Sequence, residues 1–165
     1  MEREVYVLVE KKKGLGIKIS FIISLMITFI GIIGTFAGGF VVAFAIAIIF
    51  GFITWILSKN CVEYEYSYFD GEIKLVKIKN KSRRKKIGSY SMEEVTMIAP
   101  PMDRSVYGQV NNPNIKVKDL TSQEKDAQIY VMIAKGEQGP EVIKFEPDEQ
   151  FLDAIARKYV MKVKK

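Results

Sequence analysis

Residues 19–58 contain no Asp, Glu, Lys or Arg and consist mainly of Ile, Phe, Val, Ala, Leu and Gly. One continuous helix of that length would be about 60 Å long, twice the roughly 30 Å hydrocarbon core of a bilayer. Two spans, at about 19–36 and 40–57 with a turn at Gly38-Gly39, fit the bilayer better. An unpaired backbone polar group is costly in lipid, so both spans are expected to be helical. The stretch therefore predicts a transmembrane hairpin.

The charges that flank this stretch predict its orientation. Four lysines precede it, and Lys59 and the basic residues 81–86 follow it. A hairpin returns both of its ends to the same side, and Lys and Arg mark the cytoplasmic side. We therefore expect a multi-pass protein of the cell membrane with both termini, including the segment 1–18, in the cytoplasm. A cleaved signal peptide is disfavoured, because the apolar run exceeds an h-region of about 7–15 residues and lacks a clear A-x-A cleavage site.

Small residues recur at helical spacing within the predicted hairpin. The second span carries Gly39, Ala43, Ala47 and Gly51, and the first carries Ser20, Ser24, Thr28 and Gly31. Such stripes let helix backbones approach closely in lipid. They indicate either packing of the two spans against each other or contact with a second copy or another membrane protein.

The composition excludes several kinds of catalysis. The chain has no histidine, which removes Ser-His-Asp and Cys-His mechanisms and every His-ligated metal site. Its single cysteine, Cys61, cannot form an intramolecular disulfide. No spacing of acidic residues matches a metal-binding loop. We therefore expect a protein that is not an enzyme, with no catalytic residue, metal or cofactor.

Residues 61–165 predict one small domain that begins with a β-hairpin. Tyr64, Tyr66 and Tyr68 alternate with polar residues, and Asp70-Gly71 is typical of a type I′ turn. A two-residue loop pairs Tyr68 with Ile73 and Tyr66 with Leu75, which places the apolar side chains on one face.

The remaining segments predict short strands and one helix. We expect strands near 87–90, 95–99, 129–134 and 142–145, and at most a short strand near 115–118. Residues 4–9 are either a strand that joins the sheet of this domain, which we favour slightly, or a frayed lead-in. Residues 91–94 are typical of a capping box, from Ser91 to Glu94, that opens one helical turn. Residues 79–86 are expected to form a loop, and 100–127 a long polar one. The final helix is expected over 147–160, with Pro147 at its first position.

This order of elements resembles the pleckstrin-homology-like (PH-like) barrel, in which two near-orthogonal sheets are closed at one end by the last helix. The segments 62–66, 69–72, 79–85 and 145–149 also resemble a small family of Gram-positive bacterial membrane proteins classed as a domain of unknown function. The expected class is α+β: a two-helix transmembrane hairpin followed by a mainly antiparallel PH-like β domain with a C-terminal helix. The family resemblance implies no activity.

The candidate binding residues are basic: Lys79, Lys81, Arg83, Arg84, Lys85 and Lys86. Near an anionic membrane each such charge can contribute about 1 kcal/mol, so this segment either binds anionic lipid head groups or only enforces the topology. Nucleic-acid binding is disfavoured, because the aromatics that would stack on bases lie mainly on the predicted buried face. Our first hypothesis is a membrane-anchored cytoplasmic module that binds anionic lipid or a protein partner. The alternative is a small accessory subunit of a transporter or envelope complex, with the small-residue stripes as the contact.

Overall fold

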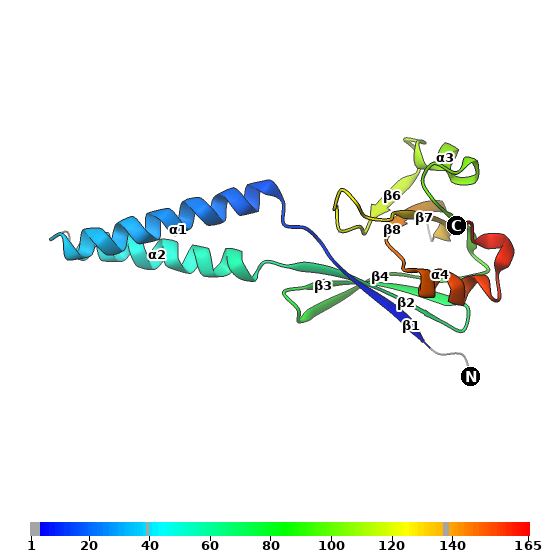
Figure 1. Ribbon diagram of the computed structural model, residues 1–165, viewed down its shortest axis with the longest axis horizontal. Helices are drawn as coiled ribbons and strands as arrows, with labels where there is room; N and C mark the ends of the chain where they lie inside the picture. The colour runs from blue at the N-terminus through cyan, green and yellow to red at the C-terminus, as the bar shows by residue number, and fades with distance from the viewer. Residues whose placement is uncertain (1–3, 39, 137–138) are drawn as a thin grey trace. The chain divides into compact units, whose positions relative to one another are not determined.

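The computed structural model describes residues 4–38, 40–136 and 139–165, which form two units. One unit contains residues 4–12 and Val62–Lys165, and the other is Lys13–Cys61. The second unit is a pair of helices inserted in the chain between the first two strands of the β unit (Figure 1). The N-terminal segment thus contributes a strand to the β unit.

The helical unit consists of α1 (Leu15–Phe36) and α2 (Phe40–Lys59). Both helices are long and apolar enough to cross a membrane. The helices contain the expected spans 19–36 and 40–57 and extend beyond them, because α1 also includes Lys18 and α2 also includes Lys59. A lysine can continue a helix while its long side chain carries the charge to polar surroundings, so an absence of charge underestimates helix length.

The two helices pack closely through small and hydroxyl-bearing residues. A Cβ atom at Gly31 would lie 3.0 Å from the carbonyl oxygen of Ala43 and 3.0 Å from the amide nitrogen of Ala47. The buried Ser24 hydroxyl donates to a backbone carbonyl of α2 at 2.9 Å and accepts from the Thr54 hydroxyl at 2.8 Å. Backbone approach this close requires glycine and alanine at the contact.

The first sheet contains β1 (Val5–Glu10), β2 (Val62–Phe69), β3 (Glu72–Lys79) and β4 (Arg83–Ser91), antiparallel and in that order. The β2–β3 turn has positive φ at both Asp70 (45°) and Gly71 (79°), as a type I′ turn requires. The predicted register is confirmed: Tyr68 lies opposite Ile73, and Tyr66 lies opposite Leu75.

The second sheet has the order β5 (Val95–Ala99), β7 (Tyr130–Gly136), β8 (Gly139–Phe145) and β6 (Lys116–Asp119). All pairs are antiparallel except β6 and β8, which are parallel. A helix that was not predicted, α3 (Arg104–Val110), covers the face of this sheet that points away from the first sheet (Figure 1). Residues 100–127 are therefore not one long loop: the Asp103 carboxylate accepts a hydrogen bond from the Ser105 amide and starts α3.

The main core lies between the two sheets and α4 (Glu149–Ala156). Tyr66, Phe145 and Phe151 are fully buried there, with edge-to-face ring contacts from Tyr66 to Phe145 and from Phe145 to Phe151. The predicted helix bounds 147–160 were wrong at both ends. Asp148 is the N-cap, since its carboxylate accepts from the Phe151 amide at 2.7 Å, and only a short 3₁₀ turn (Val160–Lys162) follows α4.

The helical turn predicted at 91–94 does not form. The Glu94 carboxylate does accept a hydrogen bond from the Ser91 amide at 3.1 Å, as a capping box requires. The chain then turns directly into β5, and the Glu94 amide donates to the Ser91 carbonyl at 2.9 Å, which closes a β-turn. The local contact was predicted correctly, but the pairing of β5 with β7 determines the path of the chain.

Candidate functional site

The basic candidate residues lie on a β-hairpin, not on the predicted loop. Lys79 is the last residue of β3, and the basic run starting at Arg83 opens β4, leaving only residues 80–82 as the turn. Asn80 and Lys81 have positive φ values of 52° and 57°. Highly charged residues can form a strand here because pairing with β3 satisfies their backbone while their side chains remain exposed.

These basic side chains differ in whether they have an acidic partner. Arg84 Nη1 lies 3.2 Å from Glu65 Oε1, with side-chain exposures of 65% and 21%. Within the described residues, Lys79, Arg83 and Lys85 form no ion pair. The hairpin therefore carries charge that the protein itself does not neutralise.

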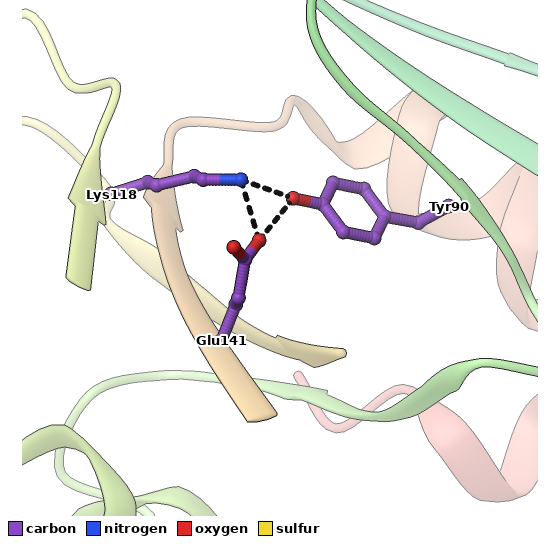
Figure 2. Close-up of polar contacts among 3 residues, drawn as sticks. All are labelled: Tyr90, Lys118 and Glu141. Carbon is purple, nitrogen blue, oxygen red and sulfur yellow. Dashed lines mark hydrogen bonds and ion pairs between the residues drawn. The ribbon is translucent and has the colours of Figure 1, made fainter. Parts of the chain in front are cut away.

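A second polar cluster lies inside the β unit (Figure 2). The Tyr90 hydroxyl of β4 donates to Glu141 Oε2 of β8 at 2.7 Å. The Lys118 ammonium group of β6 donates to the same carboxylate oxygen at 2.5 Å and to the Tyr90 hydroxyl at 2.8 Å. These three side chains, the buried polar cluster, connect the edge strand of the first sheet to two strands of the second.

Two glycines leave the space that the buried polar cluster occupies. A Cβ atom at Gly88 would lie 2.7 Å from the Tyr90 ring, and one at Gly136 would lie 2.6 Å from the Glu141 carboxyl carbon. Neither position has room for a side chain unless the cluster moves. The glycines therefore leave the room in which Tyr90 and Glu141 come within hydrogen-bonding distance.

The electrostatics of the buried polar cluster favour the charged pair. Burial alone would raise the pKa of Glu141, but hydrogen bonds from Lys118 and Tyr90 hold this pKa below its ordinary value. Burial alone would lower the pKa of Lys118, but its hydrogen bonds to Glu141 and Tyr90 raise this pKa above the ordinary value. Burial raises the pKa of the Tyr90 hydroxyl. The cluster is a neutral, mutually satisfied ion pair, and this arrangement is typical of a structural role.

The cluster could not be recognised from sequence. Tyr90 is separated by 28 residues from Lys118 and by 51 from Glu141. The available signal was a charged residue on one expected strand and another just before a second expected strand, which does not identify a partner. Among the described residues, no group of three or more His, Cys, Asp or Glu side chains is placed to hold a metal ion.

The structure also locates the candidate helix-packing residues. Ala43 and Ala47 lie against Gly31 of α1, and a Cβ atom at Gly51 would lie 3.7 Å from the Thr28 methyl group. Gly39 lies outside the described residues. The described part of the α2 stripe therefore faces α1 of the same chain.

A scan against protein-family models matches residues 3–165 to the family described as Bacterial PH-like domain (DUF6106). The chain belongs to this family. The predicted α+β class and PH-like fold are thereby confirmed, together with the resemblance to a domain of unknown function. The match to the PH-like family includes α1 and α2 as well as the β unit. Searches of curated proteins and of solved structures each found no match.

Proposed function

We propose that this protein is a membrane-anchored, non-enzymatic binding module whose PH-like domain contacts anionic lipid head groups at the cytoplasmic face of the cell membrane. In this proposal α1 and α2 insert as a hairpin, and both termini are cytoplasmic. The supporting features are the apolar helices, the lysines at their ends and the exposed basic β3–β4 hairpin. The absence of histidine from the sequence and the closed hydrogen bonding of the buried polar cluster support a non-enzymatic role.

One observation carries the proposal: the basic residues are in register with the points where the chain enters and leaves the helical unit. The Lys11 amide donates to the Val62 carbonyl at 2.8 Å, Val62 lies opposite Lys79, and Lys79 lies opposite Arg83. The tip of the basic hairpin therefore shares one end of the sheet with both chain connections.

The connections are too short to let this end of the sheet move far from the membrane. Residues 11–14 separate β1 from α1, and residues 60–61 separate α2 from β2. Two extended residues span about 7 Å, less than a Debye length at physiological salt. Val62 is thus tethered within about a Debye length of the end of α2, and Lys79 and Arg83 lie one and two strands beyond it. Near an anionic surface each such charge can contribute about 1 kcal/mol.

The accessory-subunit alternative has no comparable support. It requires the small-residue stripe of α2 to face another protein. Ala43 and Ala47 instead pack against Gly31 of the same chain. We therefore place lipid binding first.

Residue-resolved lysine acetylation tests the proposal on the full-length protein in nanodiscs. One preparation contains phosphatidylcholine only, and the other contains phosphatidylcholine with phosphatidylglycerol. We expect Lys79, Lys81 and Lys85 to react several-fold more slowly in the anionic nanodiscs, and the difference to shrink at high salt, because surface attraction is screened. The exposed Lys135 of β7 is the internal control. Equal reactivity in both preparations would contradict the proposal.

A further inference from the structure

The strand register assigns part of the basic hairpin to the face of the first sheet that forms the core. Tyr64 lies opposite Lys77, and Lys77 lies opposite Lys85. Directly opposed residues of antiparallel strands project from the same face. Tyr64 belongs to the core and is 3% exposed, and the Lys77 ammonium lies 6.0 Å from the centroid of its ring. Lys77 and Lys85 therefore extend the inner face beyond the apolar core.

The next set of opposed residues toward the hairpin turn also lies on the inner face. Val62, which packs against the core, lies opposite Lys79, and Lys79 lies opposite Arg83. The Lys11 amide donates to the Val62 carbonyl and continues the β1–β2 register, so Lys11 is on this face as well. Together the two sets form the inner basic cluster: Lys11, Lys77, Lys79, Arg83 and Lys85.

The inner basic cluster is not neutralised by the protein. Within the described residues none of its members forms an ion pair. Burial lowers the pKa of Lys77, and the charges of Lys79, Lys11 and Lys85 lower it further. Burial, and then the charge of Asp119, raises the pKa of the Tyr64 hydroxyl. The Asp119 carboxylate itself accepts hydrogen bonds from the amide and hydroxyl of Thr121.

The opposite face of the same strands is balanced. Arg84 lies opposite Ile78 and pairs with Glu65, and Lys74 pairs with Glu72 at 3.3 Å. Lys86 is on this outer face too, because it lies opposite Val76, which lies opposite Glu65. Consecutive residues from Arg83 to Lys86 thus alternate between the inner face, where the positive charges have no acidic partner among the described residues, and the outer face, where acidic residues balance them.

We propose that the inner basic cluster is a binding site for the phosphate group of one anionic phospholipid, with preference for a dianionic phosphomonoester such as the head group of phosphatidic acid. A second negative charge roughly doubles the Coulomb attraction to the cluster. The Arg83 guanidinium can bind two phosphate oxygens, and the lysines act as point charges. Outer-face residues take no part. This inference rests on the proposed function and specifies its ligand and its face.

Native mass spectrometry of the full-length protein in uncharged detergent tests the inference by counting retained lipids. The probes are phosphatidic acid and phosphatidylglycerol. The inner variant combines Lys79→Gln, Arg83→Gln and Lys85→Gln. The charge-matched control combines Lys74→Gln, Arg84→Gln and Lys86→Gln on the outer face of the same strands. Circular dichroism checks that both variants keep the β unit folded.

We expect one phosphatidic acid molecule to be retained, with affinity at least about tenfold above that for phosphatidylglycerol, since the second charge adds attraction. Each cation is expected to raise the affinity for phosphatidic acid about fivefold, so the inner variant, which removes three, should bind it about 100-fold more weakly. The outer variant should change this affinity less than about threefold. Soluble glycerol 3-phosphate is expected to compete only weakly, because it lacks the acyl chains that hold a lipid at the surface.

Each result that would contradict the inference leads to a different conclusion. Equal losses in the inner and outer variants would overturn the single-face site and leave the proposed function in place. Equal retention of both lipids would overturn the phosphomonoester preference. Glycerol 3-phosphate binding as tightly as phosphatidic acid would assign the site to a soluble ligand. Both proposals would be overturned if the unsubstituted protein retained no lipid and its lysines were acetylated equally in the two nanodisc preparations.

Discussion

Two groups of charged side chains in the β unit differ in how their charge is balanced. The buried polar cluster pairs the Lys118 ammonium with the Glu141 carboxylate, at side-chain exposures of 19% and 11%, and the Tyr90 hydroxyl bonds to both. The inner basic cluster places five cations on one face, and within the described residues none of them has an ion-pair partner.

The difference separates a structural role from a binding role. A buried ion pair tolerates desolvation only if every partner is hydrogen-bonded, and removing one partner is then costly. A cluster of like charges weakens the folded state by mutual repulsion and gains from binding an anion. Substitutions in the first group should therefore change stability, and substitutions in the second should change binding.

The largest effect is expected from breaking the buried pair. Lys118→Met leaves the Glu141 carboxylate buried without its cation, so we expect the free energy of unfolding to fall by about 3 kcal/mol. Unfolding of the full-length protein in detergent, followed by the near-ultraviolet circular dichroism of its tyrosines, measures the change.

Lys85→Met is the matched control, because it removes a lysine from the inner basic cluster. We expect it to change the free energy of unfolding by less than about 0.5 kcal/mol. A similar loss of stability in both variants would remove the distinction between the two clusters.

Alkaline titration separates the two clusters further, because deprotonation removes a destabilising charge at Lys77 and a stabilising charge at Lys118. The pKa of Lys118 is raised above 10.5, so its stabilisation is complete below 10.5 and is lost as pH rises through the folded-state pKa. The pKa of Lys77 is lowered, so its destabilisation disappears as pH rises from the folded-state pKa to 10.5. As pH rises toward 10.5, the higher free energy of unfolding expected for Lys77→Met should converge on that of the unsubstituted protein. The deficit in the free energy of unfolding of Lys118→Met should shrink only as pH rises beyond 10.5. Parallel pH curves for the two variants would contradict this assignment.

Sequence patterns predicted the elements that short-range rules control. The alternation of tyrosines with polar residues and the Asp70-Gly71 turn predicted the β2–β3 register, because a two-residue turn determines which residues face each other. The final helix was predicted from its apolar face, but its ends were not. Pro147 was taken for the first helical position, although the Asp148 carboxylate makes Asp148 the N-cap.

The parts of the fold and of the site that the sequence did not predict depend on pairing between strands or segments that are distant in the chain. Nothing in the segment 83–86 resembles a strand, and it becomes one only because β3 supplies its hydrogen bonds. The division of the basic residues between two faces follows from that register. Lys77 joins them from β3, and Lys11 from the position directly after β1. The seven-residue α3 is too short for a clear apolar period, but Asp103 followed by Ser105 was a usable N-cap signal.

The smallest effect on stability is expected at Arg84, whose sequence neighbour Arg83 lies on the opposite face. Arg84 is 65% exposed and its ion pair with Glu65 is at the surface, so Arg84→Gln should lower the free energy of unfolding by less than about 0.5 kcal/mol. Arg83→Gln removes a cation without a partner and should leave stability unchanged or slightly higher. The two variants should then separate in binding: Arg83→Gln should weaken retention of phosphatidic acid, and Arg84→Gln should not. Stability measurements and native mass spectrometry on this pair test the face assignment with one charge removed from adjacent positions. Equal weakening of lipid retention in both would show that the two faces act as one diffuse basic surface.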